Sequence, residues 1–152
     1  MSLREQIRAD LRQAMKQGDT LRVSTLRHLS AALQNREIAK RSALDDAEVV
    51  ESIVLATKQR RESIAFAQQY GRQDMAQQEQ GELAILEAYL PTPLRPEEIM
   101  QRIEAVVQEL GATSPKDLGR VMQALMPAVK GRADGQMVNR LVRERLEQPR
   151  QE

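Results

Sequence analysis

The sequence predicts an all-α protein built from two helical units. Nowhere do apolar and polar residues alternate with the period of two that marks a half-buried strand. Apolar residues instead recur every three or four positions, which is the spacing of one face of an α-helix. Three prolines within residues 91–96 interrupt this pattern. Because proline removes a backbone donor and restricts the residue before it, we expect a short, stiff linker at 91–96 between domains 1–90 and 97–147.

Two helices are predicted at the start of the chain. Gly18 is a suitable end for the first, and either Asp19 or Thr20 can cap the second, which continues to about Lys40. The side chain types at three- or four-residue spacing predict which faces are buried. These expected core positions are Leu3, Ile7, Leu11, Met15, Val23, Leu26, Leu29 and Leu33.

Two further helices are expected before the linker. Asp45 and Asp46 suit the first turn of the third helix, where the helix dipole favours negative charge. Gly71 marks a break, after which residues 72–90 resume a helical pattern. Gly81 lies inside that stretch and weakens the local preference for helix.

The chain beyond the linker predicts three more helices. Pro96 suits the first position of the fifth helix, where the missing N–H costs nothing, and Gly111 suits its end. Residues 114–117 have the Ser-Pro-Lys-Asp pattern of a capped entry into the sixth helix. Pro127 should end or kink that helix. The last helix is expected over residues 136–146.

The composition excludes several classes of function. The chain has no cysteine, which rules out disulfides, zinc–thiolate sites and cysteine nucleophiles, and one histidine cannot build a multi-histidine metal centre. Three aromatic residues are too few for a platform that stacks single-stranded bases. No apolar run approaches the roughly 20 residues that cross a bilayer, and no secretory signal is visible. We expect a cytoplasmic protein without a membrane contact, metal or cofactor.

The near-neutral total charge hides three charged blocks. Residues 4–41 have nine basic and four acidic side chains, and residues 42–87 have four basic and nine acidic ones. Residues 114–146 have seven basic and three acidic ones. Two interpretations stay open here: the basic blocks bind a polyanion, or the blocks neutralise one another where helices pack.

No catalytic constellation is visible. His28 has Ser24 one helical turn before it, but both lie mid-helix, without the strained turn and oxyanion hole that a serine nucleophile requires. The adjacent carboxylates at 45–46 and at 97–98 lie in first helical turns, where the helix dipole explains them. We therefore expect no catalytic residue in this chain.

One basic loop suggests an anion site. Residues 130–135 (Lys-Gly-Arg-Ala-Asp-Gly) join two helices, and two glycines allow backbone amides to approach a phosphate near the positive end of the next helix. The alternative is an ordinary basic turn in which Asp134 caps that helix itself. The candidate RNA-binding residues are Arg120, Lys130, Gly131, Arg132, Asn139, Arg140 and Arg143.

Two groups of motifs resemble the GatB/YqeY family, and the resemblance covers essentially the whole chain. The first group comprises Lys-Gln-Arg-Arg-Glu-Ser-Ile at 58–64, Gly-Arg-Gln-Asp-Met at 71–75 and Leu-Glu-Ala-Tyr-Leu-Pro at 86–91. The second runs from Gly-Ala-Thr-Ser-Pro-Lys-Asp-Leu-Gly at 111–119 through residues 126–135 to Val-Asn-Arg-Leu-Val at 138–142. The chain is most similar to stand-alone YqeY-like proteins.

The resemblance implies a relation to translation. The C-terminal part is similar to the tail domain of the B subunit of tRNA-dependent amidotransferases, which convert misacylated Glu-tRNA(Gln) or Asp-tRNA(Asn) to the amide with glutamine as nitrogen donor. In that family the tail is a helical appendage that contacts tRNA. The matching positions are Lys130, Gly131, Ala133, Val138 and Asn139, whereas Asp-Gly at 134–135 stands where the tail tends to have Asn-Pro.

The favoured function is therefore a non-catalytic helical tRNA-binding module. The label carbon–nitrogen ligase with glutamine as amido-N-donor belongs to the family, but this chain has neither the cradle domain nor the glutaminase that perform that reaction. Amide transfer by the chain alone is the least favoured hypothesis. The second hypothesis is an adaptor whose acidic third and fourth helices dock a basic partner, such as an aminoacyl-tRNA synthetase or an amidotransferase subunit.

Overall fold

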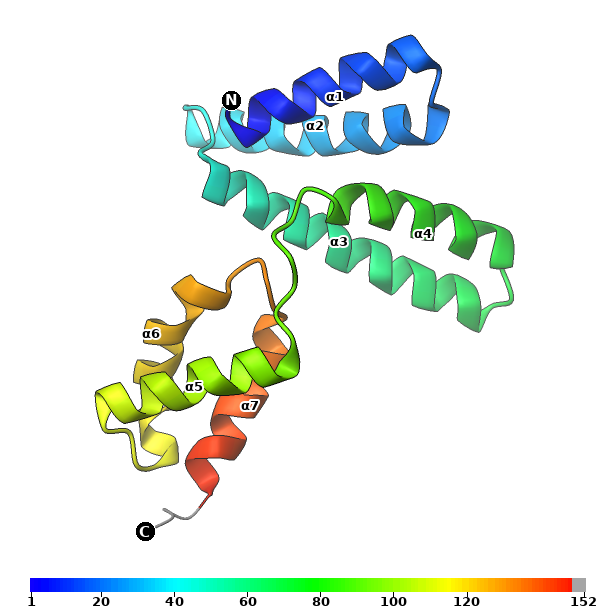
Figure 1. The fold of residues 1–152 in the computed structure, drawn as a ribbon. Coiled ribbons are helices and arrows are strands. Elements are labelled where there is room, and N and C mark those ends of the chain that lie inside the picture. The colour runs from blue at the N-terminus through cyan, green and yellow to red at the C-terminus, as the bar shows by residue number, and fades with distance from the viewer. Residues whose placement is uncertain (149–152) are drawn as a thin grey trace. The chain divides into compact units, whose positions relative to one another are not determined.

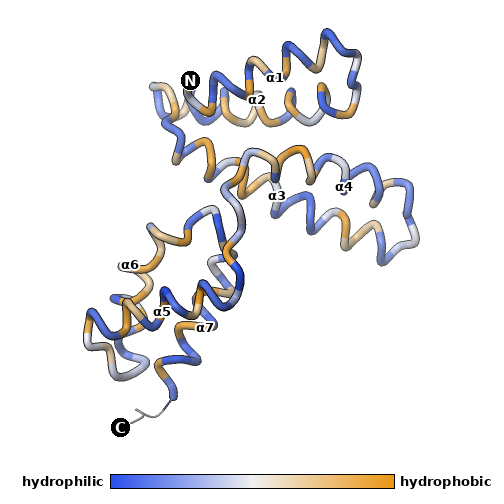
Figure 2. Tube along the Cα trace, in the orientation of Figure 1, coloured by the Kyte–Doolittle hydropathy of each residue, from blue (hydrophilic) through white to orange (hydrophobic). Residues whose placement is uncertain are grey.

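The protein is described by a computed structural model, which covers residues 1–148. Over that range the chain forms seven α-helices and one short 3-10 helix, with no strand, so the all-α prediction is confirmed. The helices gather into two compact units, Met1–Leu90 and Pro91–Glu152 (Figure 1). Hydrophobic and hydrophilic stretches alternate along the helices, as expected of amphipathic elements (Figure 2).

The first unit consists of two helical hairpins packed on each other (Figure 1). One hairpin pairs α1 (Leu3–Gln17) with α2 (Thr20–Lys40), and the other pairs α3 (Asp46–Gln69) with α4 (Gln73–Glu87). Both hairpins contribute to one main core: Ile7, Leu26, Leu29, Leu33, Leu44, Val49, Ile53 and Leu86. A smaller cluster holds the α3–α4 hairpin together farther along: Ile64, Ala67 and Ala76.

Local capping chemistry sets most helix ends in this unit. Gly18 ends α1 with a φ of 69°, and the Asp19 side chain accepts a hydrogen bond from the backbone of α2. The fourth helix is shorter than predicted and ends at Glu87. The amides of Tyr89 and Leu90 turn back three residues, because the proline that follows disfavours helical geometry at Leu90.

The buried face of α1 differs from the prediction. Met15 is exposed, and Ala14 takes the core position beside Ile7. A spacing of four residues advances about 400°, so each step drifts by roughly 40° and the stripe leaves the core within three steps. Arg4 is buried instead, with 8% of its surface exposed, and its Nε lies 3.0 Å from Oε1 of Glu37 on α2.

Gly81 allows α4 to approach α2 closely. A Cβ at this position would lie 2.8 Å from Cδ2 of Leu21, closer than side chains normally pack. The helix continues through the glycine, from Gln73 to Glu87. Gly81 therefore allows close packing between α4 and α2 and does not break the helix.

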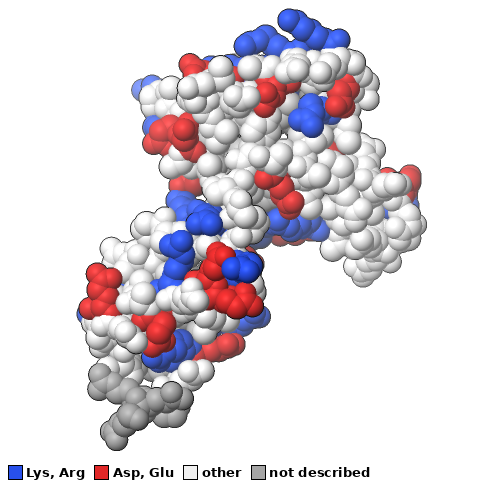
Figure 3. All heavy atoms as spheres, in the orientation of Figure 1, with Lys and Arg blue, Asp and Glu red and all other residues white. Residues whose placement is uncertain are grey.

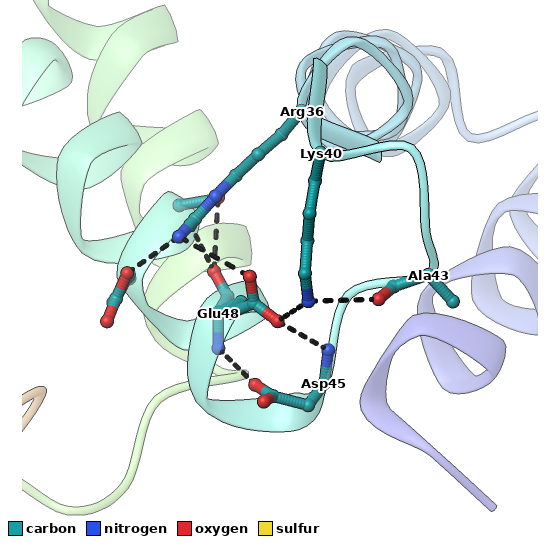
Figure 4. A network of polar contacts seen from close by, with 7 residues as sticks. Arg36, Lys40, Ala43, Asp45 and Glu48 are labelled. Atoms are coloured by element: carbon teal, nitrogen blue, oxygen red, sulfur yellow. Dashed lines mark hydrogen bonds and ion pairs between the residues drawn. The ribbon is translucent and has the colours of Figure 1, made fainter. Parts of the chain in front are cut away.

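Opposite charges are interspersed over the surface of the first unit (Figure 3). Much of this mixing comes from the corner between α2 and α3 (Figure 4). There Lys40 and Arg36 of α2 contact the Glu48 side chain, and Arg36 Nη2 also lies 2.8 Å from Oε2 of Glu51. The hydrogen bond from Lys40, followed by that from the Asp45 amide, lowers the pKa of Glu48. The basic and acidic blocks thus neutralise each other in part.

The second unit is a three-helix domain. It contains α5 (Pro96–Leu110), a 3-10 turn (Pro115–Asp117), α6 (Leu118–Val129) and α7 (Gly135–Glu147). Leu94, which precedes α5, is buried with these helices. The rest of the core comes from all three: Ile99, Ile103, Val107, Ala112, Val121, Leu125, Val129, Val138, Val142 and Leu146.

One boundary in the second unit differs from the sequence prediction. The capping box of Ser114 and Asp117 opens the 3-10 turn, so α6 begins only at Leu118. Pro127 lies in the last turn of α6, which ends at Val129, just before the predicted loop. Both Pro127 and Gln123, whose carbonyl loses its helical partner, are exposed, so solvent can satisfy the freed acceptor.

Candidate nucleic-acid interface

Two hydrogen bonds join the loop between α6 and α7 to the segment before α5. The Nε of Arg132 donates a hydrogen bond to the carbonyl oxygen of Thr92 at 3.0 Å. The amide of Leu94 donates in turn to the carbonyl oxygen of Arg132 at 2.8 Å. Arg132 was predicted as a phosphate contact, but its Nε and its carbonyl both hold the extended segment that carries the buried Leu94.

The N-terminus of α7 is occupied by the protein's own carboxylate. Asp134 caps the helix, and its Oδ1 accepts a hydrogen bond from the Gln136 amide at 3.0 Å. This is the alternative to an anion site that the sequence left open. Gly131 adopts a φ of 78°, which lets the loop turn before Arg132. The loop therefore has the geometry of a capped turn.

Four cationic residues around this loop have exposed side chains: Arg120, Lys130, Arg140 and Arg143. Arg120 lies 3.1 Å from Asp117 within the same segment, and Arg140 is 4.0 Å from Glu144, one turn farther along α7. The Arg140 side chain is 68% exposed in spite of that contact. Ion pairs of this exposed kind stabilise by only about 0–1 kcal/mol, so they do not prevent these cations from binding another anion.

Asn139, Arg140 and Arg143 form a short polar face on α7. They lie one, three and four positions apart, and Nη2 of Arg143 donates to Oδ1 of Asn139 at 3.2 Å. Asn139 is half-buried and uncharged. Its hydrogen bond orients the guanidinium of Arg143 without changing the net charge of this face. The structure thus brings three of the predicted residues together on one helix, while Arg120 lies on α6.

Arg145, another cation of α7, stabilises the packing of the second unit. Arg145 makes two hydrogen bonds to Glu104 of α5, at 2.6 Å and 2.9 Å. The bonds from Arg145 lower the pKa of Glu104, and those to Glu104 raise the pKa of Arg145. Sequence reasoning missed this pair, because 41 residues separate its members. The only available signal was the opposite charge of α5 and α7.

The first helix offers a second group of exposed cations. Arg8, Arg12 and Lys16 are exposed at intervals of four along α1 and have no ion pair within residues 1–148. Basic side chains are visible along the outer edge of α1 (Figure 3). Arg4, the first member of the predicted basic stripe, is withdrawn by its pair with Glu37.

The other sequence features give no reactive arrangement. His28 and Ser24 are both exposed on the regular helix α2, where no strained turn presents either side chain. Asp45 caps α3, which accounts for one acidic pair. Within residues 1–148, no three histidine, aspartate or glutamate side chains gather as a metal site, and no helix is long and apolar enough to cross a bilayer.

The sequence matches the family described as Yqey-like protein over residues 4–146, which spans both helical units. The chain belongs to the YqeY family. This membership confirms the resemblance derived from the motifs. The family is related to the tail domain of the amidotransferase B subunit.

Curated relatives of this YqeY-family chain share one name. The chain is 34% identical over 110 residues to the mitochondrial "Altered inheritance of mitochondria protein 41" of Eremothecium gossypii, covering 70% of the chain and 60% of the relative. It is 32% identical over 113 residues to the protein of that name from Kluyveromyces lactis, covering 72% and 60%. The Pyrenophora tritici-repentis protein is 26% identical over 142 residues, covering 91% and 77%. The chain thus spans about 60% of the length of the first two relatives.

Proposed function

We propose that this YqeY-family protein is a non-catalytic module that binds folded tRNA through the phosphate backbone. The observation that carries the proposal is the exposed cationic face of α7, where Arg140 and Arg143 lie one turn apart. Lys130, at the start of the loop before α7, and Arg120, in the first turn of α6, are exposed as well. Guanidinium groups bind phosphates through two parallel hydrogen bonds, which suits this arrangement.

The shape of the RNA, rather than its bases, is the expected target. All three aromatic residues of the chain lie in the first unit, so the second unit has no ring on which a base could stack. Paired RNA is recognised mainly through phosphates and 2′-hydroxyls. The relation to the amidotransferase tail supports tRNA as the folded RNA in question.

The proposal gives the predicted residues different roles. Arg140 and Arg143 are the main phosphate ligands of the proposal, and Asn139 orients Arg143. Arg132 and Gly131 shape the loop, so they support the interface rather than form it. Arg8, Arg12 and Lys16 of α1 offer additional phosphate contacts. No amide-transfer step is part of the proposal, and a cytoplasmic location stays a prediction.

The test is tRNA binding as a function of salt concentration. Removing two phosphate contacts with Arg140→Gln and Arg143→Gln should lower the magnitude of the slope of log K against log salt by about 1.4–1.8. The matched control is Arg61→Gln, since Arg61 is an exposed arginine of α3 that is paired with Glu87. Absence of tRNA binding at low salt, or an equal effect of the control, would contradict the proposal.

A further inference from the structure

Two of the three aromatic residues form an exposed pair at the outer end of the α3–α4 hairpin. Phe66 is 64% exposed and Tyr70 is 63% exposed, and their ring centroids are 4.6 Å apart on successive turns of α3. Met75 of α4 is also exposed. Aromatic and methionine side chains left together in water are typical of protein interfaces rather than of free surfaces.

These side chains line an open groove of about 850 Å³. One wall is a stripe of α3 that runs from Gln59 to Tyr70, and the other is a stripe of α4 from Arg72 to Glu79. Only the small cluster of Ile64, Ala67 and Ala76 lies between the two helices here. Two antiparallel helices with a thin core and exposed apolar stripes leave room for a third helix on top.

The charged side chains of the groove indicate which kind of partner it would bind. Three acidic residues of α3 and α4 have well-covered partners: Glu48 and Glu51 with Arg36, and Glu82 with Arg60. Glu87 and Asp74 have more exposed ion pairs, with Arg61 and with Arg72, the cation of the groove lining. Glu62 and Glu79, which line the groove, have no ion pair within residues 1–148. The Oε2 atom of Glu79 is also buried from solvent and has no hydrogen-bond partner there.

We infer that the groove between α3 and α4 docks a basic amphipathic helix of a partner protein. Apolar residues of that helix would cover Phe66, Tyr70 and Met75, while a lysine or arginine would reach Glu79 and Glu62. A cation placed over the aromatic rings gains a further attraction. The α3 stripe is about 16 Å long, which corresponds to three turns of a partner helix.

The same charges disfavour the other occupants. The two unpaired carboxylates repel the phosphates of an RNA and the headgroups of an anionic membrane. The inference is independent of Arg140 and Arg143, the main phosphate ligands of the proposed tRNA interface, which lie on α7 of the second unit. It narrows the broader hypothesis of docking through the acidic helices to one groove, because most of the other carboxylates of these helices already have internal partners.

The experiment uses the full chain and a fluorescent synthetic peptide of about four helical turns. The peptide has leucines at i, i+3, i+4 and i+7 and lysines on the flanks, and fluorescence anisotropy reports its binding. We expect saturable binding that weakens about tenfold in the double variant Phe66→Ala, Tyr70→Ala. The variant Glu79→Gln should weaken binding about threefold and reduce its salt dependence.

Matched controls distinguish peptide binding in the groove from non-specific hydrophobic binding. Leu55→Ala removes another exposed apolar side chain of α3, 56% exposed and outside the groove, and should leave peptide binding unchanged. Unchanged helical circular dichroism shows that the aromatic variant folds. A scrambled peptide, or one with glutamates in place of the lysines, should bind at least tenfold more weakly than the lysine peptide.

Four outcomes overturn the inference. One is equal binding of the glutamate and lysine peptides, and another is no loss of binding in the aromatic variant. The third is concentration-dependent self-association of the chain that Phe66→Ala, Tyr70→Ala abolishes, because the occupant would then be a second copy. Loss of tRNA binding in the aromatic variant, without peptide binding to the wild type, would reassign the rings to RNA. Because Arg140 and Arg143 are unchanged in all these variants, the proposed tRNA interface is tested separately.

Discussion

The guanidinium of Arg132 donates from Nε to the carbonyl oxygen of Thr92, across 40 residues of sequence. This bond, together with that between the Leu94 amide and the Arg132 carbonyl, fastens the segment before α5 to the loop before α7. Arg132, a predicted phosphate contact, thus also joins these two segments. Loss of the Arg132 side-chain hydrogen bond should be visible in the dynamics of the segment before α5.

The variant Arg132→Ala should accelerate amide hydrogen exchange at Leu94. Loss of the side-chain hydrogen bond is expected to cost about 0.5–1.5 kcal/mol of local stability, while the backbone bond stays possible. Exchange measured by NMR at Leu94 checks this. Arg143→Ala serves as the control, because the one side-chain hydrogen bond of Arg143 within residues 1–148 is to Asn139 of its own helix. Unchanged exchange in Arg132→Ala would show that the Arg132 side-chain hydrogen bond is not formed in solution.

Asp134 is expected to weaken the proposed RNA interface, since its negative charge lies in the basic loop before α7. The variant Asp134→Asn keeps a good capping residue and removes the charge. It should tighten tRNA binding by a factor of about two to five, as expected for one charge at a helix terminus. Asp134→Ala is the contrasting variant, which also loses the cap and about 1 kcal/mol of stability. Equal tRNA affinity of wild type and Asp134→Asn would place the RNA elsewhere.

The pair between Glu104 and Arg145 should make the stability of the second unit depend on pH. The pKa of Glu104 is lower in the folded state than in the unfolded state, so its contribution is present at neutral pH. The contribution is lost as the pH falls below about 4 and the carboxylate is protonated. Glu104→Gln should therefore lower the melting temperature at pH 7. The difference from wild type should vanish in strong acid, and a difference that persists there would argue against the ion pair.

The buried pair between Arg4 and Glu37 predicts an asymmetry between its two deletions. Glu37→Ala leaves the Arg4 charge buried without its partner and should destabilise the first unit by about 3 kcal/mol. Arg4→Met leaves the Glu37 carboxylate without its partner, but Glu37 is less buried than Arg4 and water can solvate it, so this variant should cost less than Glu37→Ala. Urea unfolding monitored by circular dichroism measures both. Equal costs for the two variants would contradict the burial of Arg4.

The helices and most of their ends could be predicted because they depend on neighbouring residues. Gly18 and Gly111 end helices in the left-handed conformation, and Pro96 opens α5 at its first position, as the sequence indicated. The start of α6 differs from the prediction, because the capping box at Ser114 opens a 3-10 turn rather than the helix itself.

The candidate site was predictable only in part. The exposed cations of α7 follow from its amphipathic pattern, and the cap at Asp134 was an alternative in the sequence because capping is local. The hydrogen bond between Arg132 and Thr92 and the ion pair of Arg145 with Glu104 could not be predicted from the sequence. Each joins residues about 40 positions apart, and sequence periodicity says nothing about which helix faces which.

The helical class, the break at the prolines, the absence of cysteine chemistry and the membership in the YqeY family all follow from the amino-acid pattern. Which charges remain available depends instead on how the helices pack. Helix packing neutralises Arg4, Arg36 and Arg145 and fastens Arg132, while it leaves Arg140 and Glu79 without a strong partner. The physical reason is that a charge can be neutralised by any residue that folding brings within about 4 Å, whatever its distance along the chain.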